Sequence, residues 1–567
     1  MNNLSFSIHI FLIITNCSIQ HFMKKFYLVA LFLFAIVMVE AREVELLSTT
    51  DYKYQVAKQI FEKLIEAKGD KRMQMPEFVM SKNKRYVAWM DNKKMQIGLE
   101  EAAYDVCITY GSDSSNTIAA LLAHEITHYY EKHSWGNDFA TAFTDLSVSG
   151  TVKSNAKSAI MKTTNETEAD YLGGFLAYSA GFKTFGVMPN FLVDVYAEYG
   201  LPSEIPGYPS LDDRSKLAVE SEMKLEELIN IFDAANYMIV LQQYDVVNDY
   251  YSYILKEFQS REIYNNAGVN AVMAALQLFD EGSEQLKYSY PIQLDGETRM
   301  SRPKARGEAL GFAEKVERRN HLLEKARFYF EQARALDAEY ATGFINLACV
   351  HDLMNNYEEA NFFAKKAGKI ARTNNNIKVE GDAYIIRGIA AIHEGEESEG
   401  LDYFRQAAAK DKDCEPLAQL NMDIFNGTVS TITPPRPKIS LTKEKIENVN
   451  LDAFMESIDV DMLLEVTSNV SCGIKSMDES KILLNLIDGG QSGYTLLHLT
   501  GGNYSGSTGD DIKIGAYKTD VIAKYGNPTY IQEARQGQFL VYDFKNIAFF
   551  ISDGEVKNWA LYRVQEE

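Results

Sequence analysis

The sequence predicts a multidomain, mainly α-helical protein with smaller mixed α+β parts before and after a helical centre. Its 567 residues are too many for one hydrophobic core, since domains of roughly 100–200 residues are usual. The central stretch 216–425 is helix-patterned throughout and repeats itself. A proline-containing segment, Thr433 to Pro437, then separates the repeats from a strand-rich C-terminal part.

The N-terminal residues 1–41 have the parts of a secretory signal. Lys24 and Lys25 precede an apolar run, and Val39-Glu40-Ala41 offers a small-residue cleavage site. The apolar run of about 14 residues is too short to span a bilayer comfortably. We therefore expect 1–41 to be a signal peptide, with Met23 as a possible true start and a retained membrane anchor as the alternative. The mature chain would then have no membrane span and lie in an exported compartment.

The net charge bears on possible nucleic-acid binding, and the cysteine positions bear on possible disulfides and metal sites. The formal net charge is −22, so phosphate backbones would be repelled and nucleic acid is not an expected partner. Cys107, Cys349, Cys414 and Cys472 are far apart and form no CxxC pair. We expect buried free thiols rather than a specified disulfide or a cysteine metal site. The oligomeric state is left undetermined.

The first domain, 42–215, begins with helical and then strand-like patterns. Residues 51–67 read as an amphipathic helix, and three short β-like runs follow, at Glu77 to Met80, Tyr86 to Met90 and Met95 to Glu100. Ser114, Ser115 and Asn116 offer side-chain caps for a helix that starts near Thr117. A small sheet is thus expected before this helix.

This helix carries the motif His124-Glu125-Ile126-Thr127-His128. Histidines four positions apart lie about 40° apart around a helix, so both imidazoles can reach one zinc ion. Glu125 between them is placed to take a proton from an attacking water, which makes it the candidate general base. With 9 histidines in the chain, chance would produce the motif in about one of a hundred such sequences.

A catalytic zinc site needs a third protein ligand. His133 is nearest in sequence, but a metzincin would carry that histidine one position later, at Ser134. The better candidate is Glu166, with Asp170 one turn further along the same helix face. Glu166 would bind the metal, and Asp170 would accept a hydrogen bond from a ligand imidazole and fix its tautomer.

Two motifs resemble those of the gluzincin-like metallopeptidases that include the CAAX prenyl protease, the heat-shock protease HtpX and periplasmic proteases with tetratricopeptide repeats. They are Ala120 to His128 and Glu166-Thr167-Glu168-Ala169-Asp170, followed by Gly181-Phe182. The resemblance covers roughly 50–220. It implies a zinc endopeptidase with ligands His124, His128 and Glu166, acting on polypeptide, although the two motifs are closer together than is usual.

Tyr208-Pro209 and Arg214 stand where that family often carries His-Pro followed by Arg. The Tyr208 phenol could donate a hydrogen bond to a tetrahedral oxyanion, which makes it a candidate catalytic residue. A turn residue before a helix is the alternative.

The helical centre, 216–425, has a 34-residue period, which is typical of tetratricopeptide repeats. Ala333 and Ala367 lie 34 positions apart in similar segments, and Ala407 closes a third such segment. Stacked helix pairs of this kind form a solenoid with a concave surface for polypeptide, or else a brace for the first domain. The polar stretch Ser289 to Arg306 between copies, with two prolines, predicts a loop.

After the linker 426–445, residues 446–567 form a separate α+β module. Its last part, Ile514 to Pro528 with strand-like Gln538 to Phe544, Ile547 to Ile551 and Val556 to Arg563, weakly resembles small domains of the BamE type from outer-membrane assembly lipoproteins. The resemblance implies protein binding without chemistry.

Together these features predict an exported, periplasmic zinc endopeptidase for protein substrates, among them envelope or outer-membrane proteins, with a role in their quality control. The periplasm is favoured through the two resemblances alone. The rival is a non-proteolytic chaperone or assembly scaffold that uses the helical repeats and keeps a structural metal site. The intact Glu125 separates the two, because a structural metal needs no base beside it. By analogy with the family that the motifs resemble, the strand around Met95 to Glu100 is expected to bind extended substrate as an added strand.

Overall fold

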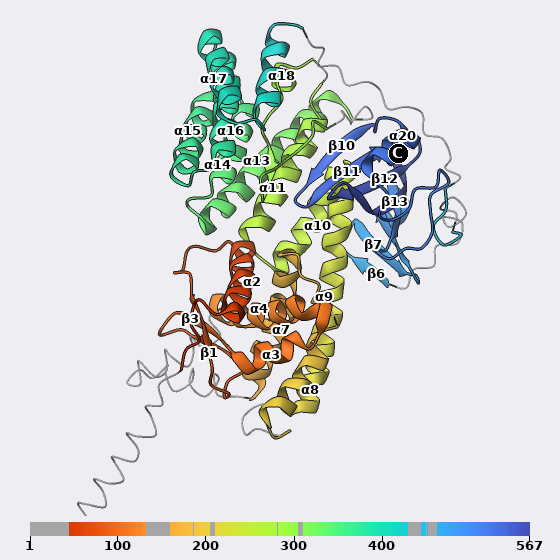
Figure 1. The fold of residues 1–567 in the computed structure, drawn as a ribbon. Coiled ribbons are helices and arrows are strands. Elements are labelled where there is room, and N and C mark those ends of the chain that lie inside the picture. Colours follow the sequence, from red (N-terminus) through yellow and green to blue (C-terminus); the bar gives the residue numbers. More distant parts are fainter. Residues whose placement is uncertain are drawn as a thin grey trace, which may run out of the picture.

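The computed structural model describes residues 45–131, 159–184, 186–203, 210–280, 282–303, 310–428, 444–449, 451 and 462–566. It is multidomain and mainly α-helical with a C-terminal β-sheet part, as the sequence predicts (Figure 1). The expected signal segment 1–41, the alternative ligand His133, the candidate Tyr208 and the proline segment Thr433 to Pro437 lie outside the described residues. Among the helices that are described, none combines the length and the apolar character needed to cross a membrane.

A small sheet and a group of helices form the N-terminal part. The sheet has the order β1-β3-β2, with β1 parallel and β2 antiparallel to β3. Its strands are β1 Glu77–Ser81, β2 Ala88–Asp91 and β3 Gln96–Glu100. The helices are α2 Tyr52–Lys68, α3 Glu101–Ile108, α4 Ser114–Tyr130, α7 Ala159–Ser179 and α8 Met188–Tyr199, with a 3-10 turn at Gly111–Asp113. The three strands and the first helix are those that the sequence predicts, within two residues.

Two elements in this part begin at other residues than the sequence predicts. Strand β2 starts at Ala88 rather than Tyr86, because the backbone N–H groups of Arg85, Tyr86 and Val87 turn inward to donate to the buried carboxylate of Glu100. Helix α4 starts at Ser114 rather than near Thr117, and no side chain caps it. The preceding 3-10 turn already brings the chain into helical geometry, and the Ser114 hydroxyl donates to the carbonyl of Gly111 instead (2.6 Å).

Helix α9, Leu211–Val240, connects the N-terminal part to the rest of the molecule (Figure 1). Its 30 residues correspond to a length of about 45 Å. An antiparallel array of helices follows: α10 Tyr244–Glu257, α11 Arg261–Gln277, α12 Glu284–Lys287, α13 Phe312–Leu336, α14 Ala341–Leu353, α15 Tyr357–Thr373, α16 Ile377–His393, α17 Glu397–Lys410 and α18 Glu415–Phe425. Ala333, Ala367 and Ala407, the repeated small residues, are fully buried in α13, α15 and α17.

The stretch from Ser289 to Met300 is not a solvent loop. It forms a short hairpin, β4 Gln293–Leu294 with β5 Thr298–Arg299, inside the helical array. The Gln293 backbone N–H donates to Asn346 on α14 (3.1 Å), and its side chain donates to Asp382 on α16 (3.2 Å). Polar side chains of the helices thus bond to the hairpin, which helps to stabilise a polar segment in a buried place.

The C-terminal part is one antiparallel sheet of eight strands in the order β10-β11-β12-β13-β9-β8-β7-β6. The strands are β6 Met462–Glu465, β7 Val470–Ser476, β8 Ser480–Ile487, β9 Gly493–Thr500, β10 Tyr530–Ala534, β11 Gly537–Tyr542, β12 Ile547–Ser552 and β13 Glu555–Glu566, with helix α20 Lys518–Tyr525 before β10. Two four-stranded meanders are thus joined where β9 pairs with β13. The sequence predicts β11, β12 and β13, which the structure confirms, but not the first meander.

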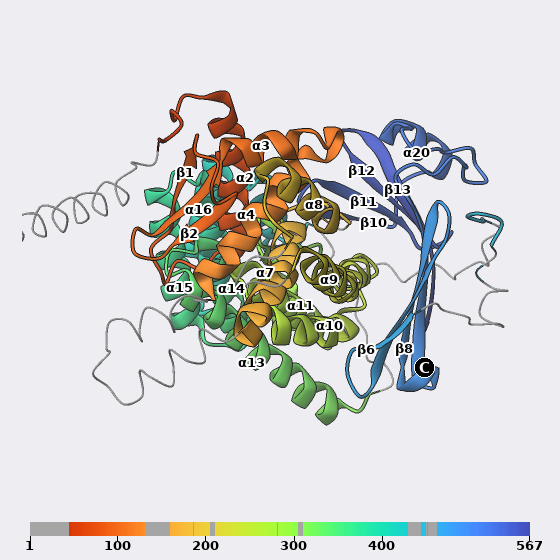
Figure 2. The same ribbon diagram turned by 90° about the horizontal axis from the view of Figure 1, so that it is seen from below.

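Both faces of this sheet are buried. One face, with Leu483, Leu497 and Val541, belongs to the same hydrophobic core as the helices. The other face, with Phe549 and Trp559, packs under α20. Polar contacts tie the sheet to α9: Lys481 donates to Asn230 (2.9 Å), and the Tyr530 hydroxyl donates to the carbonyl of Val240 (2.6 Å). Figure 2 shows the sheet running along one side of α9.

Candidate metal centre

Helix α7 packs between α4 and α9 because two adjacent glycines allow close contact on both sides. A Cβ atom on Gly173 would lie 2.9 Å from the backbone nitrogen of His124 on α4. A Cβ atom on Gly174 would lie 2.4 Å from a methyl group of Leu225 on α9. The pair therefore brings three helices together at the level of the His124 motif. A Gly-Gly pair inside a helix-patterned stretch is the sequence signal for this contact.

Three side chains from α4 and α7 converge at one point. The Nε2 atoms of His124 and His128 are 3.0 Å apart, and the Glu166 carboxylate lies 3.6 Å from the first and 3.7 Å from the second. Two ligands of one tetrahedral zinc ion are about 3.3 Å apart, given bond lengths near 2.0–2.1 Å. In the part of the chain that the structure describes, this is the one group of His, Cys, Asp or Glu side chains spaced to hold a metal ion. Its two imidazoles and one carboxylate fit zinc.

Asp170 fixes the orientation of one imidazole. Its Oδ1 lies 2.7 Å from Nδ1 of His124, and its side chain is 3% exposed. In the neutral imidazole, Nδ1–H donates to this carboxylate, which leaves Nε2 as the metal-binding lone pair. The structure thus places Asp170 in the orienting position that the sequence analysis expects.

Arg214 is a further residue of the site. The Ser210 side chain caps α9 by accepting from Asp213 N–H (3.1 Å), which sets Arg214 in the first turn of that helix. Its Nη1 donates to Oε2 of Glu166 (2.8 Å), and Nη2 lies 3.8 Å from Oδ2 of Asp170. From the sequence, Arg214 is recognisable only as part of a motif, without a role of its own. Its contact with two carboxylates of another helix depends on the packing of α9 on α7.

Charge compensation is close to complete in the metal-free site. Burial alone would lower the pKa of His124, but the Asp170 and Glu166 carboxylates outweigh it and raise that pKa to about 10. Burial likewise opposes ionisation of Glu166, yet His124 and Arg214 hold the pKa of this carboxyl well below its usual range. A divalent cation bound here would compete with a second proton for the imidazole of His124.

Glu125 differs from the other carboxylates of the site. It follows His124 by about 100° around the helix, and its side chain is only partly exposed. Burial raises the pKa of Glu125 to about 7, with Glu166 and Asp170 adding to the shift and His124 opposing it. Neither Glu166 nor Arg214 bonds to it. A carboxylate with this pKa can both take and return a proton near neutral pH.

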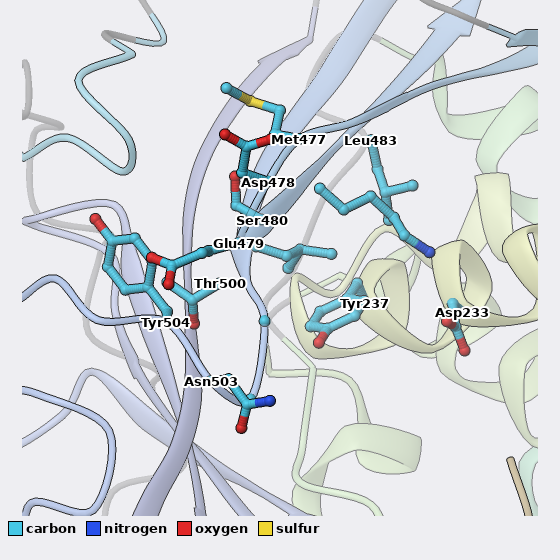
Figure 3. Close-up of a pocket in the computed structure, with 14 residues that line it drawn as sticks. Asp233, Tyr237, Met477, Asp478, Glu479, Ser480, Leu483, Thr500, Asn503 and Tyr504 are labelled. Atoms are coloured by element: carbon cyan, nitrogen blue, oxygen red, sulfur yellow. The ribbon is translucent and has the colours of Figure 1, made fainter.

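A cavity lies well away from this centre, towards the end of α9 that is opposite Arg214. It has a volume of about 430 Å³ and lies between α9 and the β8–β9 strands, with Asp233, Tyr237 and Lys481 among its lining residues (Figure 3). Asp233 is 19 residues beyond Arg214, which corresponds to about 28 Å along the helix. The cavity is therefore not part of the metal centre.

Comparison with known proteins gives no family for this chain. No protein-family model matches it, and no characterised protein is significantly similar to it. The geometry of the cluster formed by His124, His128 and Glu166 is therefore the basis for assigning a function.

Proposed function

We propose that this protein is a zinc-dependent endopeptidase that cleaves polypeptides. The observation that carries the proposal is the convergence of His124, His128 and Glu166 beside a glutamate, Glu125, that is not one of the three donors. A structural metal site would be complete with closed coordination by the protein and would not need the glutamate.

In the proposed mechanism His124, His128 and Glu166 hold the zinc ion, and Asp170 and Arg214 hold two of these ligands in place. Zinc, when bound, lowers the pKa of water and polarises a carbonyl oxygen. Glu125 takes the proton of the attacking water and passes it to the amine that leaves. No nucleophile of the protein and no covalent intermediate is required.

The strand proposed to receive substrate is β2 rather than the expected Met95 to Glu100. That stretch is β3, the central strand, and both of its edges are paired, with β1 and with β2. It cannot accept another strand. Strand β2 packs on α4, and its second edge has no partner strand among the described residues. An extended peptide could pair with this edge.

We extend this proposal to the domains of the chain and to its location. We take the N-terminal part, with its zinc site, as the metallopeptidase domain, and the helices α13–α18 as repeats of the tetratricopeptide type. The 34-residue period and the buried alanines at equivalent positions support the second assignment. Export to a periplasm, and envelope proteins as substrates, follow from the resemblances of the sequence.

The test is a comparison of the wild-type chain with Glu125→Gln. Both should contain about one zinc per chain, and the variant should cleave an unfolded test protein at least about 100-fold more slowly, because it lacks the base. Zinc content is measured by mass spectrometry and cleavage by gel electrophoresis. The rival function, a chaperone or scaffold with a structural metal, predicts instead that neither protein cleaves any polypeptide while both suppress its aggregation.

A further inference from the structure

A groove with a floor of small residues lies between α15 and α16, in the helical array. Its volume is about 260 Å³, and its floor is formed by Ala364, Gly368 and Ala383. A Cβ atom on Gly368 would lie 3.2 Å from Cβ of Ala383, so the two helices are in close contact there. The groove is thus shallow, and the side chains around it determine what it can bind.

The rim of this groove is basic. Lys365, Lys369 and Arg372 follow each other at helical spacing along one face of α15, and Arg387 faces them from α16. The one carboxylate of the lining, Glu380, is already paired with two cations, Arg372 (2.9 Å) and, from α17, Lys410 (2.7 Å).

Three of the four rim cations have no carboxylate partner. Among the described residues, no Asp or Glu oxygen lies within ion-pair distance (4.0 Å) of Lys365, Lys369 or Arg387. The chain as a whole has 79 acidic and 57 basic residues. An acidic protein that keeps a group of cations unpaired on one surface has positive charge available there for another molecule.

Arg387 is held in place by neutral groups. Its Nε donates to the amide oxygen of Asn361 (3.2 Å), its guanidinium carbon lies 4.0 Å from the ring centre of Tyr403, and it also donates to the Tyr403 hydroxyl. Tyr384 stacks on Tyr403 with ring centres 6.2 Å apart. The guanidinium is therefore oriented before a ligand arrives. The carboxylate of Glu399 accepts from the Tyr403 hydroxyl rather than from Arg387.

We propose that this groove binds an acidic segment of a polypeptide, whose Asp or Glu side chains pair with Lys365, Lys369 and Arg387. Phe362 lies on the same face of α15, one turn before Lys365, and is 61% exposed. It offers an apolar contact next to the carboxylates. A short acidic segment meets only the groove, whereas a nucleic acid strand would extend over the remaining surface of a chain with net charge −22.

In one respect this inference rests on the proposed function: the bound segment would belong to a substrate of the metal centre. Binding itself does not depend on cleavage. The groove and the metal centre lie on different helices, so each can be tested without the other.

The experiment measures the fluorescence anisotropy of a labelled peptide of about twelve residues, alternating Glu and Ser, with the full chain carrying Glu125→Gln. We expect saturable binding at low salt that weakens as salt rises. Lys365→Glu together with Lys369→Glu should weaken binding at least about tenfold. The matched control is Lys412→Glu together with Lys513→Glu, which changes two other exposed lysines by the same charge and should leave binding unchanged.

Three results would overturn the inference: equal weakening by the two double variants, equal binding of a Ser/Gly peptide of the same length, or tighter binding of a thymidine oligonucleotide. The proposed function is tested separately, by cleavage rather than by peptide binding. In the chain with intact Glu125, the groove variants should still cleave an unfolded protein that lacks acidic segments at the wild-type rate. Absence of cleavage in all of these chains would contradict the proposed function and leave the binding result as it is.

Discussion

At the scale of single residues, the site is a set of opposite charges that position one another. Asp170 contacts His124, Arg214 contacts Glu166, and the two helices that carry the acidic pair and the histidines are in direct contact. His124 and Glu166 are therefore each oriented by a contact with another side chain of the protein.

Replacing Asp170 with Asn should lower zinc affinity by about 10- to 100-fold, because the imidazole loses the carboxylate that orients it. In the wild type, zinc should also displace about one proton per chain at pH 7, since the pKa of His124 is raised to about 10 without metal. Calorimetry in two buffers of different ionisation heat measures both. Asp194→Asn on α8 serves as control, because it removes the charge of a carboxylate that accepts a hydrogen bond from Tyr110. It should change neither the zinc affinity nor the number of protons released. Unchanged affinity in Asp170→Asn would contradict the orienting role.

At the scale of elements, the close packing of α7 against α4 and α9 depends on Gly173 and Gly174. Gly173→Ala should place a methyl group 2.9 Å from a backbone nitrogen of α4, where no side-chain rotation can relieve the contact. We expect a loss of about 1–3 kcal/mol in the free energy of unfolding. Zinc affinity should fall as well, because the donors move apart.

Chemical denaturation and zinc titration check this prediction. Gly502→Ala is the control, since an added Cβ there meets no atom within 4 Å. If both variants behave alike, close packing of α7 is not what holds the donors together.

The free edge of β2 makes a second prediction at this scale. Glu100 N–H donates to the carbonyl of Val87, so by alternation in an antiparallel pair the N–H groups of Ala88 and Met90 point away from β3. Met90→Pro removes one outward donor without breaking the sheet. The specificity constant for an unfolded substrate should fall about tenfold, with zinc content unchanged. A wild-type rate would exclude β2 as the substrate-binding strand.

At the scale of the whole molecule, the C-terminal sheet packs against the helices. It shares the main core with them and contacts α9, whose first turn carries Arg214. The seam of its two meanders contains His498, which is fully buried opposite Ile482 and Leu561 and bonds to Ser480 (2.8 Å).

Acid should destabilise the protein through this histidine. Burial lowers the pKa of His498 to about 4, from an unfolded value of 6.5. Below pH 6.5 His498 is protonated in the unfolded chain but not in the folded chain. The free energy of unfolding that is present above this pH is therefore lost as the pH falls towards 4. The loss should reach about 3 kcal/mol.

Urea denaturation between pH 7 and 4.5 measures this loss. His498→Gln should flatten the pH dependence relative to wild type, whereas His321→Gln, at an exposed position on α13, should not. An equal slope in all three proteins would show that His498 does not control acid stability.

Much of the candidate site follows from spacing along the chain. The four-residue intervals from His124 to His128 and from Glu166 to Asp170 place each pair on one helix face, and the 34-residue period indicates the helical array. These are properties of single helices, which local periodicity determines.

What the tertiary structure alone decided concerns pairs of segments far apart in sequence. It set Arg214 against Glu166, made β2 rather than β3 the edge strand, buried the hairpin near Gln293 and joined the C-terminal sheet to α9. Periodicity shows which face of an element is apolar, but not which partner covers it. That choice depends on close contacts such as those at Gly173 and Gly174, where shape rather than hydrophobic pattern selects the neighbour.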